Sequence, residues 1–311
     1  MKKLKNYLSL IKFSHTIFAM PFALIGFFLS TREVEGHWSL ARIGQWNLNR
    51  TIGWTATGKP EVYLLPRFLL VILCMVFARS AAMAFNRYLD RSFDAKNPRT
   101  AIREIPAGII SANNALMFTL VCCLLFVVCC YFINTLCFAL SPVALFVVLG
   151  YSFTKRFTPL CHLILGLGLS LAPIGAYLAV TGQFALLPIL FSLTVLFWVS
   201  GFDIIYALQD EEFDKSQKLY SIPAWLGKIK ALRVSEILHL LSATCIVLAG
   251  FYGQFGLWYW IGVMFFLGLL IYQHSLVRPN DLSKVNLAFA TTNGIASVVF
   301  AVFVITDLFI H

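Results

Sequence analysis

Nine strongly apolar segments recur along this chain of 311 residues, separated by short polar stretches. A helix needs about 20 apolar residues to cross the hydrocarbon core of a bilayer. The segments cover residues 15–32, 64–86, 113–134, 136–153, 160–180, 185–208, 232–252, 256–277 and 286–309. The sequence therefore predicts an all-α polytopic membrane protein with nine transmembrane helices. No linker is long enough to divide the chain, so residues 1–311 are expected to form a single membrane domain.

The composition argues against the partners that a basic charge would otherwise suggest. The chain is 59% hydrophobic and 12% charged, with a mean hydropathy of +0.81, far more apolar than a soluble domain of this size needs. The net charge is +10, but basic residues between spans are typical of cytoplasmic loops and of phosphate binding. No nucleic-acid-binding module is recognisable. We expect the lipid bilayer as a partner, and neither nucleic acid nor a required protein partner.

The distribution of Lys and Arg predicts the orientation of the chain. With the N-terminus in the cytoplasm, the basic clusters at 87–103, 155–156 and 215–233 fall on the cytoplasmic side, as the positive-inside rule expects. The loop at about 33–63 is an exception, because it carries basic residues on the outer side. Its tryptophans favour an interfacial segment at the level of the lipid headgroups.

The first concentration of charge follows the second apolar segment. Asn86, Asp90 and Asp94 are spaced i, i+4 and i+8, so they share one stripe if the helix continues through them. Such oxygen ligands suit Mg²⁺, which usually takes one or two carboxylates and completes its shell with substrate phosphates. Arg99 and Arg103 are candidates to bind those phosphates. The stretch indicates a magnesium–diphosphate site, and the alternative is a charged loop flanking the membrane.

A second acidic cluster closes the sixth apolar segment. It repeats the pattern Asp-x-x-Phe-Asp of the first cluster, here completed by Asp210 and Asp214. Together with Asp203 and Tyr206 these residues follow 3-4-4 spacing, which again places them on one helical stripe. Two matched clusters are hard to explain as surface charge. We expect their four aspartates to be catalytic and, with the asparagine of the first motif, to bind the metal, and we expect Asp203 and Tyr206 to contact substrate.

Two basic residues extend this expected site. Arg79 lies inside the second apolar segment, where a charge is costly and normally faces a polar cavity or a carboxylate. Because it precedes Asn86 by seven residues, it lies on the same helical face. We expect Arg79 in the same cavity, either as the partner of a motif aspartate or as a diphosphate contact. Lys155, at the end of the fourth segment, is a further candidate diphosphate ligand, although alone it would be an ordinary positive-inside residue.

Taken together, these residues resemble the motifs of the UbiA family of intramembrane aromatic prenyltransferases. The family's Asn-x-x-x-Asp-x-x-x-Asp motif is matched by Asn86, Asp90 and Asp94, and its second aspartate motif by Asp210 and Asp214. Three further segments resemble those of the family: Arg79-Ser-Ala, Arg99-Thr-Ala-Ile-Arg-Glu-Ile-Pro-Ala-Gly and Tyr151-Ser-Phe-Thr-Lys-Arg-Phe-Thr. The resemblance covers nearly the whole chain.

The resemblance implies nine helices around a central cavity whose polar mouth faces the cytoplasm, in the inner membrane of a bacterium. Mg²⁺ would bridge the aspartates and a polyprenyl diphosphate, and an aromatic acid would be the second substrate. Mg²⁺, Arg and Lys would promote ionisation of the allylic diphosphate, and the resulting cation would attack the electron-rich ring. An apolar cavity would protect that cation from water. A motif aspartate or the released diphosphate would accept the ring proton.

The sequence is consistent with two classes of aromatic acceptor. After the second motif comes Leu219-Tyr-Ser-Ile-Pro-Ala, where 4-hydroxybenzoate enzymes usually have Lys-Ser-Thr. This segment and the first apolar segment look more like the subgroup linked to menaquinone synthesis through futalosine. The acceptor is therefore either 4-hydroxybenzoate, for ubiquinone, or a dihydroxynaphthoate, for menaquinone.

A membrane transporter with intramembrane carboxylates as ion sites is the alternative function. Transporters usually keep such charges near the midplane of the bilayer. Here the carboxylates gather at one surface among Arg and Lys, as a phosphate site would require.

Overall fold

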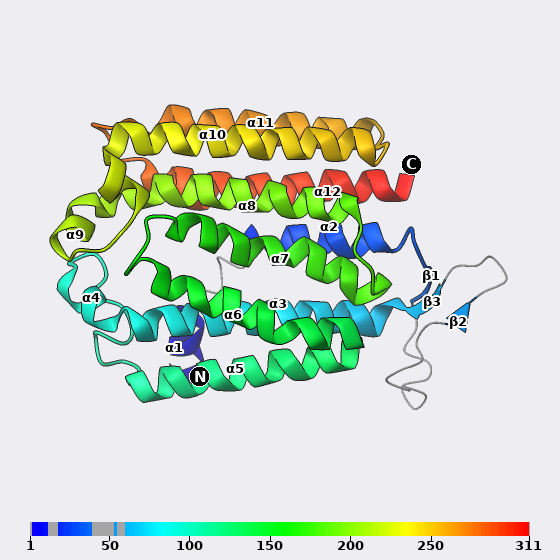
Figure 1. The fold of residues 1–311 in the computed structure, drawn as a ribbon, viewed down its shortest axis with the longest axis horizontal. Coiled ribbons are helices and arrows are strands. Elements are labelled where there is room, and N and C mark those ends of the chain that lie inside the picture. Colours follow the sequence, from blue (N-terminus) through cyan, green and yellow to red (C-terminus); the bar gives the residue numbers. More distant parts are fainter. Residues whose placement is uncertain (1, 12–17, 39–52, 55–59, 311) are drawn as a thin grey trace.

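The structure is a computed structural model that describes residues 2–11, 18–38, 53–54 and 60–310. Long helices run side by side along the longest axis of the molecule (Figure 1). The helices are α1 (Lys2–Leu10), α2 (Met20–Ser30), α3 (Leu64–Leu89), α4 (Arg91–Lys96), α5 (Ala112–Ile133), α6 (Thr135–Thr154), α7 (Cys161–Thr181), α8 (Leu186–Ala207), the 3₁₀ turn η3 (Leu208–Asp210), α9 (Glu211–Ser216), α10 (Ile222–Tyr252), α11 (Leu257–Leu276), the π-helical η4 (Leu287–Thr292) and α12 (Asn293–Ile310). The strands are β1 (Glu35–His37), β2 (Gly53–Trp54) and β3 (Pro60–Tyr63).

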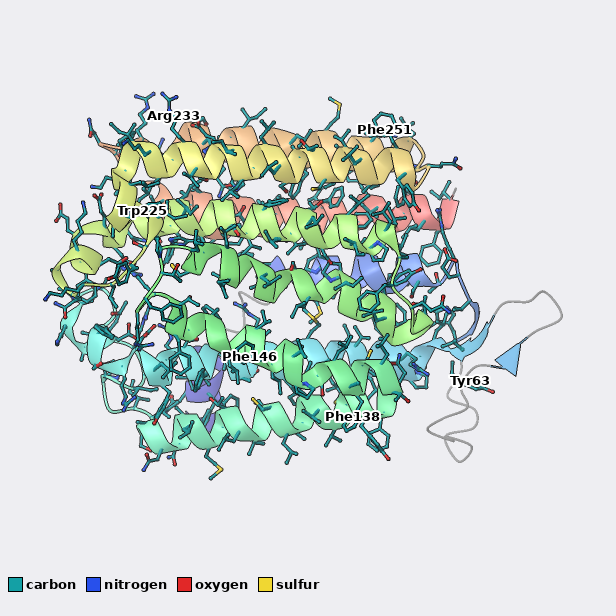
Figure 2. All side chains as sticks on the ribbon, in the orientation of Figure 1. Tyr63, Phe138, Phe146, Trp225, Arg233 and Phe251 are labelled. Atoms are coloured by element: carbon teal, nitrogen blue, oxygen red, sulfur yellow. The ribbon has the colours of Figure 1, made fainter. Side chains whose placement is uncertain are left out.

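Eight helical segments in the described part of the chain are long and apolar enough to cross a membrane. The predicted first span, 15–32, contains the shorter apolar helix α2 and begins in residues outside the described ranges. Large apolar side chains such as Phe146 and Phe251 are more than two-thirds exposed (Figure 2). Exposed apolar surface on so many helices is expected where lipid covers it. The predicted all-α, multi-pass membrane fold is confirmed.

The helices form a closed ring. Each of the long helices packs against the next one in the sequence, from α2 through α3, α5, α6, α7, α8, α10 and α11 to α12. Helix α12 then packs against α2, which closes the ring. The ends of α3 and α8 that carry the acidic motifs lie at the same end of the molecule, together with α4 and α9 (Figure 1).

An aromatic cluster fills one side of the ring. Trp198 of α8 is fully buried against Phe22, Phe266 and the rings around them. Its indole N–H donates to Asn293 Oδ1 at 3.1 Å, which satisfies the polar group that burial would otherwise leave unpaired. The cluster fixes α8 against α2, α11 and α12, and so holds one wall of the cavity described below.

Helix α10 begins at residue 222 rather than at the predicted 232. Ser221 caps it, because its hydroxyl accepts a hydrogen bond from Ala224 N at 3.2 Å. The helix is broken at Gly227, whose φ of 76° and ψ of 165° favour glycine. Basic residues from 228 to 233 interrupt the apolar pattern here, so hydropathy alone missed the first turns.

A three-stranded sheet lies at the end of the molecule opposite α4 and α9 (Figure 1). Its strand order is β1-β3-β2, with β1 parallel and β2 antiparallel to β3. The sequence predicts an interfacial loop at about 33–63, and the structure forms these short strands within it. Residues 39–52 and 55–59 of that loop lie outside the described ranges.

Candidate active site

A cavity of about 290 Å³ opens between the two acidic motifs. Its walls come from α3, α4, α6, α7, α8, α9 and the segment that follows α4. All the residues that the sequence predicted for the site line this cavity: Arg79, Asn86, Asp90, Asp94, Arg99, Arg103, Lys155, Asp203, Tyr206, Asp210 and Asp214. The structure therefore brings together residues that are up to 135 positions apart, from Arg79 to Asp214.

The first aspartate of each motif interrupts its helix. Asp90 has φ −87° and ψ 4°, and Asp210 has φ −101° and ψ 3°, outside the regular helical range. The condition for a single stripe from Asn86 to Asp94, an unbroken helix, is therefore not met, because α3 ends at Leu89 and α4 begins at Arg91. The same happens where α8 tightens into η3 before α9.

Ion pairs hold the carboxylates of the first motif. Asp90 Oδ1 lies 2.9 Å from Arg156 Nη2, and Asp90 Oδ2 accepts a hydrogen bond from Asn86 Nδ2 at 3.1 Å. Asp94 is buried and its Oδ1 accepts from Arg103 Nη1 at 2.6 Å. Both aspartates are thus oriented toward cationic groups that could also bind a phosphate.

The second motif is arranged in the same way. Arg99 Nη2 donates to Asp210 Oδ2 at 2.6 Å, and Arg99 Nη1 donates to Tyr206 Oη at 3.0 Å. Asp214 is fully buried, with Lys155 Nζ at 2.7 Å from Oδ1 and the Ser221 hydroxyl donating to Oδ2 at 2.8 Å. A buried carboxylate needs such partners, since an unpaired charge there would be costly.

The two motifs are in direct contact through the segment that follows α4. Arg99 from that segment forms its ion pair with Asp210, and Asn97 Nδ2 lies 3.5 Å from the same carboxylate. Lys96 Nζ also donates to Gln217 Oε1 at 3.3 Å, just beyond α9. The two carboxylate clusters therefore face one shared space.

Asp90 and Lys155, which lie outside the membrane-spanning segments, have shifted pKa values. Burial raises the pKa of Asp90 to about 6, although Arg156 opposes the shift. Burial lowers the pKa of Lys155, but its ion pair with Asp214 outweighs that effect and leaves the pKa above its usual value. At neutral pH both groups are therefore mainly charged.

Arg79 lies deeper in the cavity. Among the described residues it forms no ion pair with a motif aspartate, and its buried Nε has no hydrogen-bond partner. This arrangement argues against a structural partnership with an aspartate, one of the two roles considered for Arg79. The Nε of Arg79 is therefore a donor at the cavity wall that has no partner among the described residues.

Unsatisfied polar atoms gather at this cavity. Four of its buried side-chain atoms have no hydrogen-bond partner in the described structure: Arg79 Nε, Arg87 Nε, Asp94 Oδ2 and Ser152 Oγ. Buried polar atoms are rarely left so, and a cluster of them indicates a bound group. The carboxylate oxygens suit Mg²⁺. Within the described ranges, however, no three His, Cys, Asp or Glu side chains form a metal site by themselves.

Comparison with known proteins decides the family. Residues 51–301 match the UbiA prenyltransferase family. The 4-hydroxybenzoate octaprenyltransferase of Nitrosomonas europaea is 32% identical over 257 residues, covering 82% of this chain and 86% of that protein. The chain belongs to the UbiA prenyltransferase family.

Solved structures agree with this membership. A UbiA homolog from Aeropyrum pernix K1 has a TM-score of 0.74 at 26% identity, covering 95% of this chain and 97% of its own. The UbiA homolog from Archaeoglobus fulgidus has a TM-score of 0.68 at 18% identity, covering 98% of this chain and all of its own. At 18% identity, the similarity to the Archaeoglobus fulgidus structure shows only that the two proteins share a fold.

Several polar residues line the cavity of this UbiA member without having been chosen from the sequence, among them Arg87, Asn97, Arg156 and His162. Arg156 is adjacent to Lys155, and both were equally consistent with the positive-inside rule, so its pairing with Asp90 was not visible. His162 pairs with Asp203, which is 41 residues away. No local spacing signals such a pair, and only the packing of α7 on α8 reveals it.

Proposed function

We propose that this protein transfers a polyprenyl group from a polyprenyl diphosphate to the ring of an aromatic acid, as a step in ubiquinone or menaquinone biosynthesis. The observation that carries the proposal is the meeting of two acidic motifs across one cavity, where Arg99 of the first region pairs with Asp210 of the second. A diphosphate bound there would have carboxylates on both sides and Arg and Lys around it.

The proposed metal ligands are Asn86, Asp90, Asp94, Asp210 and Asp214. When bound, Mg²⁺ would neutralise the charge that develops on the leaving diphosphate. The unsatisfied Asp94 Oδ2 supports this role, because it is a buried oxygen that suits a hard cation. The Archaeoglobus fulgidus homolog is described as bound to DMAPP and Mg²⁺, and this supports the same pair of ligands here.

The basic residues would change partners when substrate binds. Arg99, Arg103 and Lys155 now contact aspartates. In the loaded site they would bind phosphate oxygens, and these hydrogen bonds would strengthen as the carbon–oxygen bond breaks. Tyr206, held by Arg99, would position the same phosphate group. Arg79 offers an unsatisfied donor deeper in the cavity.

Apart from Arg79, the inner part of the cavity is mainly apolar. Its lining there includes Met83, Leu165, Leu169, Val199 and Phe202. These side chains would hold the prenyl chain next to the diphosphate and exclude water from the allylic cation. The cation would then react with the aromatic ring rather than with water.

The acceptor and the orientation are also part of the proposal. The name of the Nitrosomonas europaea relative supports 4-hydroxybenzoate, whereas Leu219-Tyr-Ser-Ile-Pro-Ala favours a dihydroxynaphthoate. We propose that the N-terminus and the mouth of the cavity face the cytoplasm of a bacterial inner membrane. The clustering of basic residues at the α4 and α9 end supports this orientation.

A direct assay tests the proposal. Membranes containing the protein are incubated with Mg²⁺, a labelled polyprenyl diphosphate and each candidate acid in turn, and apolar prenylated products are extracted. Product from one acid alone identifies the acceptor class. The absence of product with every acid, together with ion-driven uptake of a solute, would overturn the proposal in favour of a transporter.

A further inference from the structure

Asp203 differs from the other carboxylates of the cavity. The four motif aspartates each form an ion pair with Arg or Lys. Asp203 Oδ2 instead lies 2.6 Å from His162 Nδ1, and in the described part of the chain no Arg or Lys forms an ion pair with it. Unlike the motif aspartates, Asp203 therefore does not form an ion pair with the Arg and Lys side chains described around the diphosphate site.

Asp203 lies deeper in the cavity than the two motif aspartates that follow it in the sequence. It precedes Asp210 by seven residues, which corresponds to about 10 Å along a helix axis at 1.5 Å per residue. On its own helix it follows Val199 and Phe202, which line the apolar part of the cavity. Asp203 thus lies where the polar and apolar parts meet. The reacting carbon of a prenyl diphosphate belongs at this boundary, because its diphosphate needs the polar part and its chain the apolar part.

His162 fixes the orientation of this carboxylate. The backbone N–H of Ile222 donates to His162 Nε2 at 3.4 Å, so the ring proton is on Nδ1 and is donated to Asp203 Oδ2. His162 is only 3% exposed, and its imidazole links α7, α8 and the start of α10. Asp203 Oδ1 has no hydrogen bond to another described residue, and the side chain remains 22% exposed in the cavity.

We propose that Asp203 accepts the ring proton in the prenyl transfer, with His162 as its positioning residue; this inference rests on the proposed function. The allylic carbon–oxygen bond breaks and its electron pair leaves with the diphosphate. A π pair of the aromatic ring forms the new carbon–carbon bond. The carbon–hydrogen bond at that ring position then breaks, its pair restores the aromatic ring, and the proton passes to Asp203 Oδ1. The carboxylic acid later releases the proton to water at the cavity mouth.

In the loaded site the competing proton acceptors would be engaged with cations. The motif aspartates and the diphosphate would share their charge with Mg²⁺, Arg and Lys, and nearby positive charge lowers the proton affinity of an oxygen. Asp203 forms no ion pair with Arg or Lys among the described residues, and its one hydrogen-bond partner there is the His162 imidazole. A positioned general base typically contributes about 10²–10⁴-fold to a rate.

The test uses Asp203→Asn and an acceptor deuterated at the ring position that forms the bond. In the unaltered protein ionisation precedes proton loss, so we expect equal rates for light and deuterated acceptor. In Asp203→Asn we expect kcat to fall about 100-fold and a primary isotope effect to appear, with KM for the prenyl diphosphate unchanged. His162→Gln, which can still donate to Asp203, should restore most of the activity lost in His162→Leu.

Asp281→Asn is the matched control, since this aspartate lies in an exposed turn where its partners are Ser283 and Arg278. It should show neither a rate loss nor an isotope effect. The inference is overturned if Asp203→Asn keeps the full rate, or if it loses rate without an isotope effect while KM for the diphosphate rises. Failure of the unaltered protein to form any product would instead refute the proposed function, and the inference with it.

Discussion

Asp90 and Asp210 adopt nearly the same backbone conformation although 120 positions separate them in the sequence. Each precedes a six-residue helix, and the second aspartate of the motif is the fourth residue of that helix in both cases, Asp94 in α4 and Asp214 in α9. The pattern Asp-x-x-Phe-Asp therefore forms the same local unit twice. Residues in this sparsely populated region of φ/ψ space are common in active sites, which agrees with the roles proposed for both.

The first prediction concerns the two leading aspartates. Asp90→Asn and Asp210→Asn keep the size of the side chain but remove a charge that Mg²⁺ requires. We expect each to lower kcat/KM at least about 100-fold, because electrostatic stabilisation of the leaving group is lost, while the melting temperature in detergent changes little. Product formation and thermal unfolding measure the two effects. Turnover near that of the unaltered protein in both variants would contradict the assigned roles.

The second prediction concerns the bridge between the motifs. Arg99 contacts both Asp210 and Tyr206 through separate nitrogens, a geometry that Lys cannot reproduce. Arg99→Lys should raise KM for the prenyl diphosphate about tenfold, as expected for the loss of one charge-assisted hydrogen bond. Arg91→Lys is the matched control, since Arg91 contacts Tyr88 and does not line the cavity. Equal effects of the two substitutions would argue against a specific role for Arg99.

The third prediction concerns cooperative binding of metal and diphosphate. No group of three His, Cys, Asp or Glu residues in the described ranges forms a metal site alone, so Mg²⁺ should need phosphate oxygens to complete its shell. Mg²⁺ alone should raise the melting temperature only slightly, and Mg²⁺ with a prenyl diphosphate should raise it strongly by mass action. EDTA should abolish both that shift and turnover. Full stabilisation by Mg²⁺ alone would contradict this expectation.

The fourth prediction concerns the crossing of α2 and α7. A Cβ atom at Gly26 would clash with the carbonyl oxygen of Pro173, which belongs to the backbone and cannot rotate away. Gly26→Ala should therefore destabilise the protein by about 1–3 kcal/mol, as overpacking usually does. Gly175→Ala on α7 has open space around the new methyl group, and it should be neutral or stabilising. Thermal unfolding of the two variants compares them, and equal stability would show that α2 shifts to accommodate the methyl group.

Much of the fold could be predicted from the sequence, because a lipid bilayer allows few kinds of secondary structure to cross it. A chain of long apolar segments must satisfy its backbone within each helix, and carboxylates at two helix ends indicate where a polar site lies. The partners of those carboxylates were less accessible. Whether Arg156 or Lys155 faces Asp90 depends on the rotation of α6, and the His162–Asp203 pair depends on the packing of α7 against α8. Whether the helix continues through Asp90 was left open, because i, i+4 spacing does not distinguish a broken helix from an unbroken one.

The ion pairs across the cavity have a consequence for how ligands associate. Five aspartates face six Arg and Lys residues there: Asp90, Asp94, Asp203, Asp210 and Asp214, against Arg79, Arg87, Arg99, Arg103, Lys155 and Arg156. The charges of these side chains nearly cancel. Binding of a metal ion and an anion therefore replaces existing ion pairs with new ones and does not neutralise a strongly charged cavity. The affinity for the metal ion and the diphosphate together should therefore depend only weakly on ionic strength. A diphosphate that binds without its metal ion would displace the carboxylates from Arg and Lys and leave them without a cationic partner.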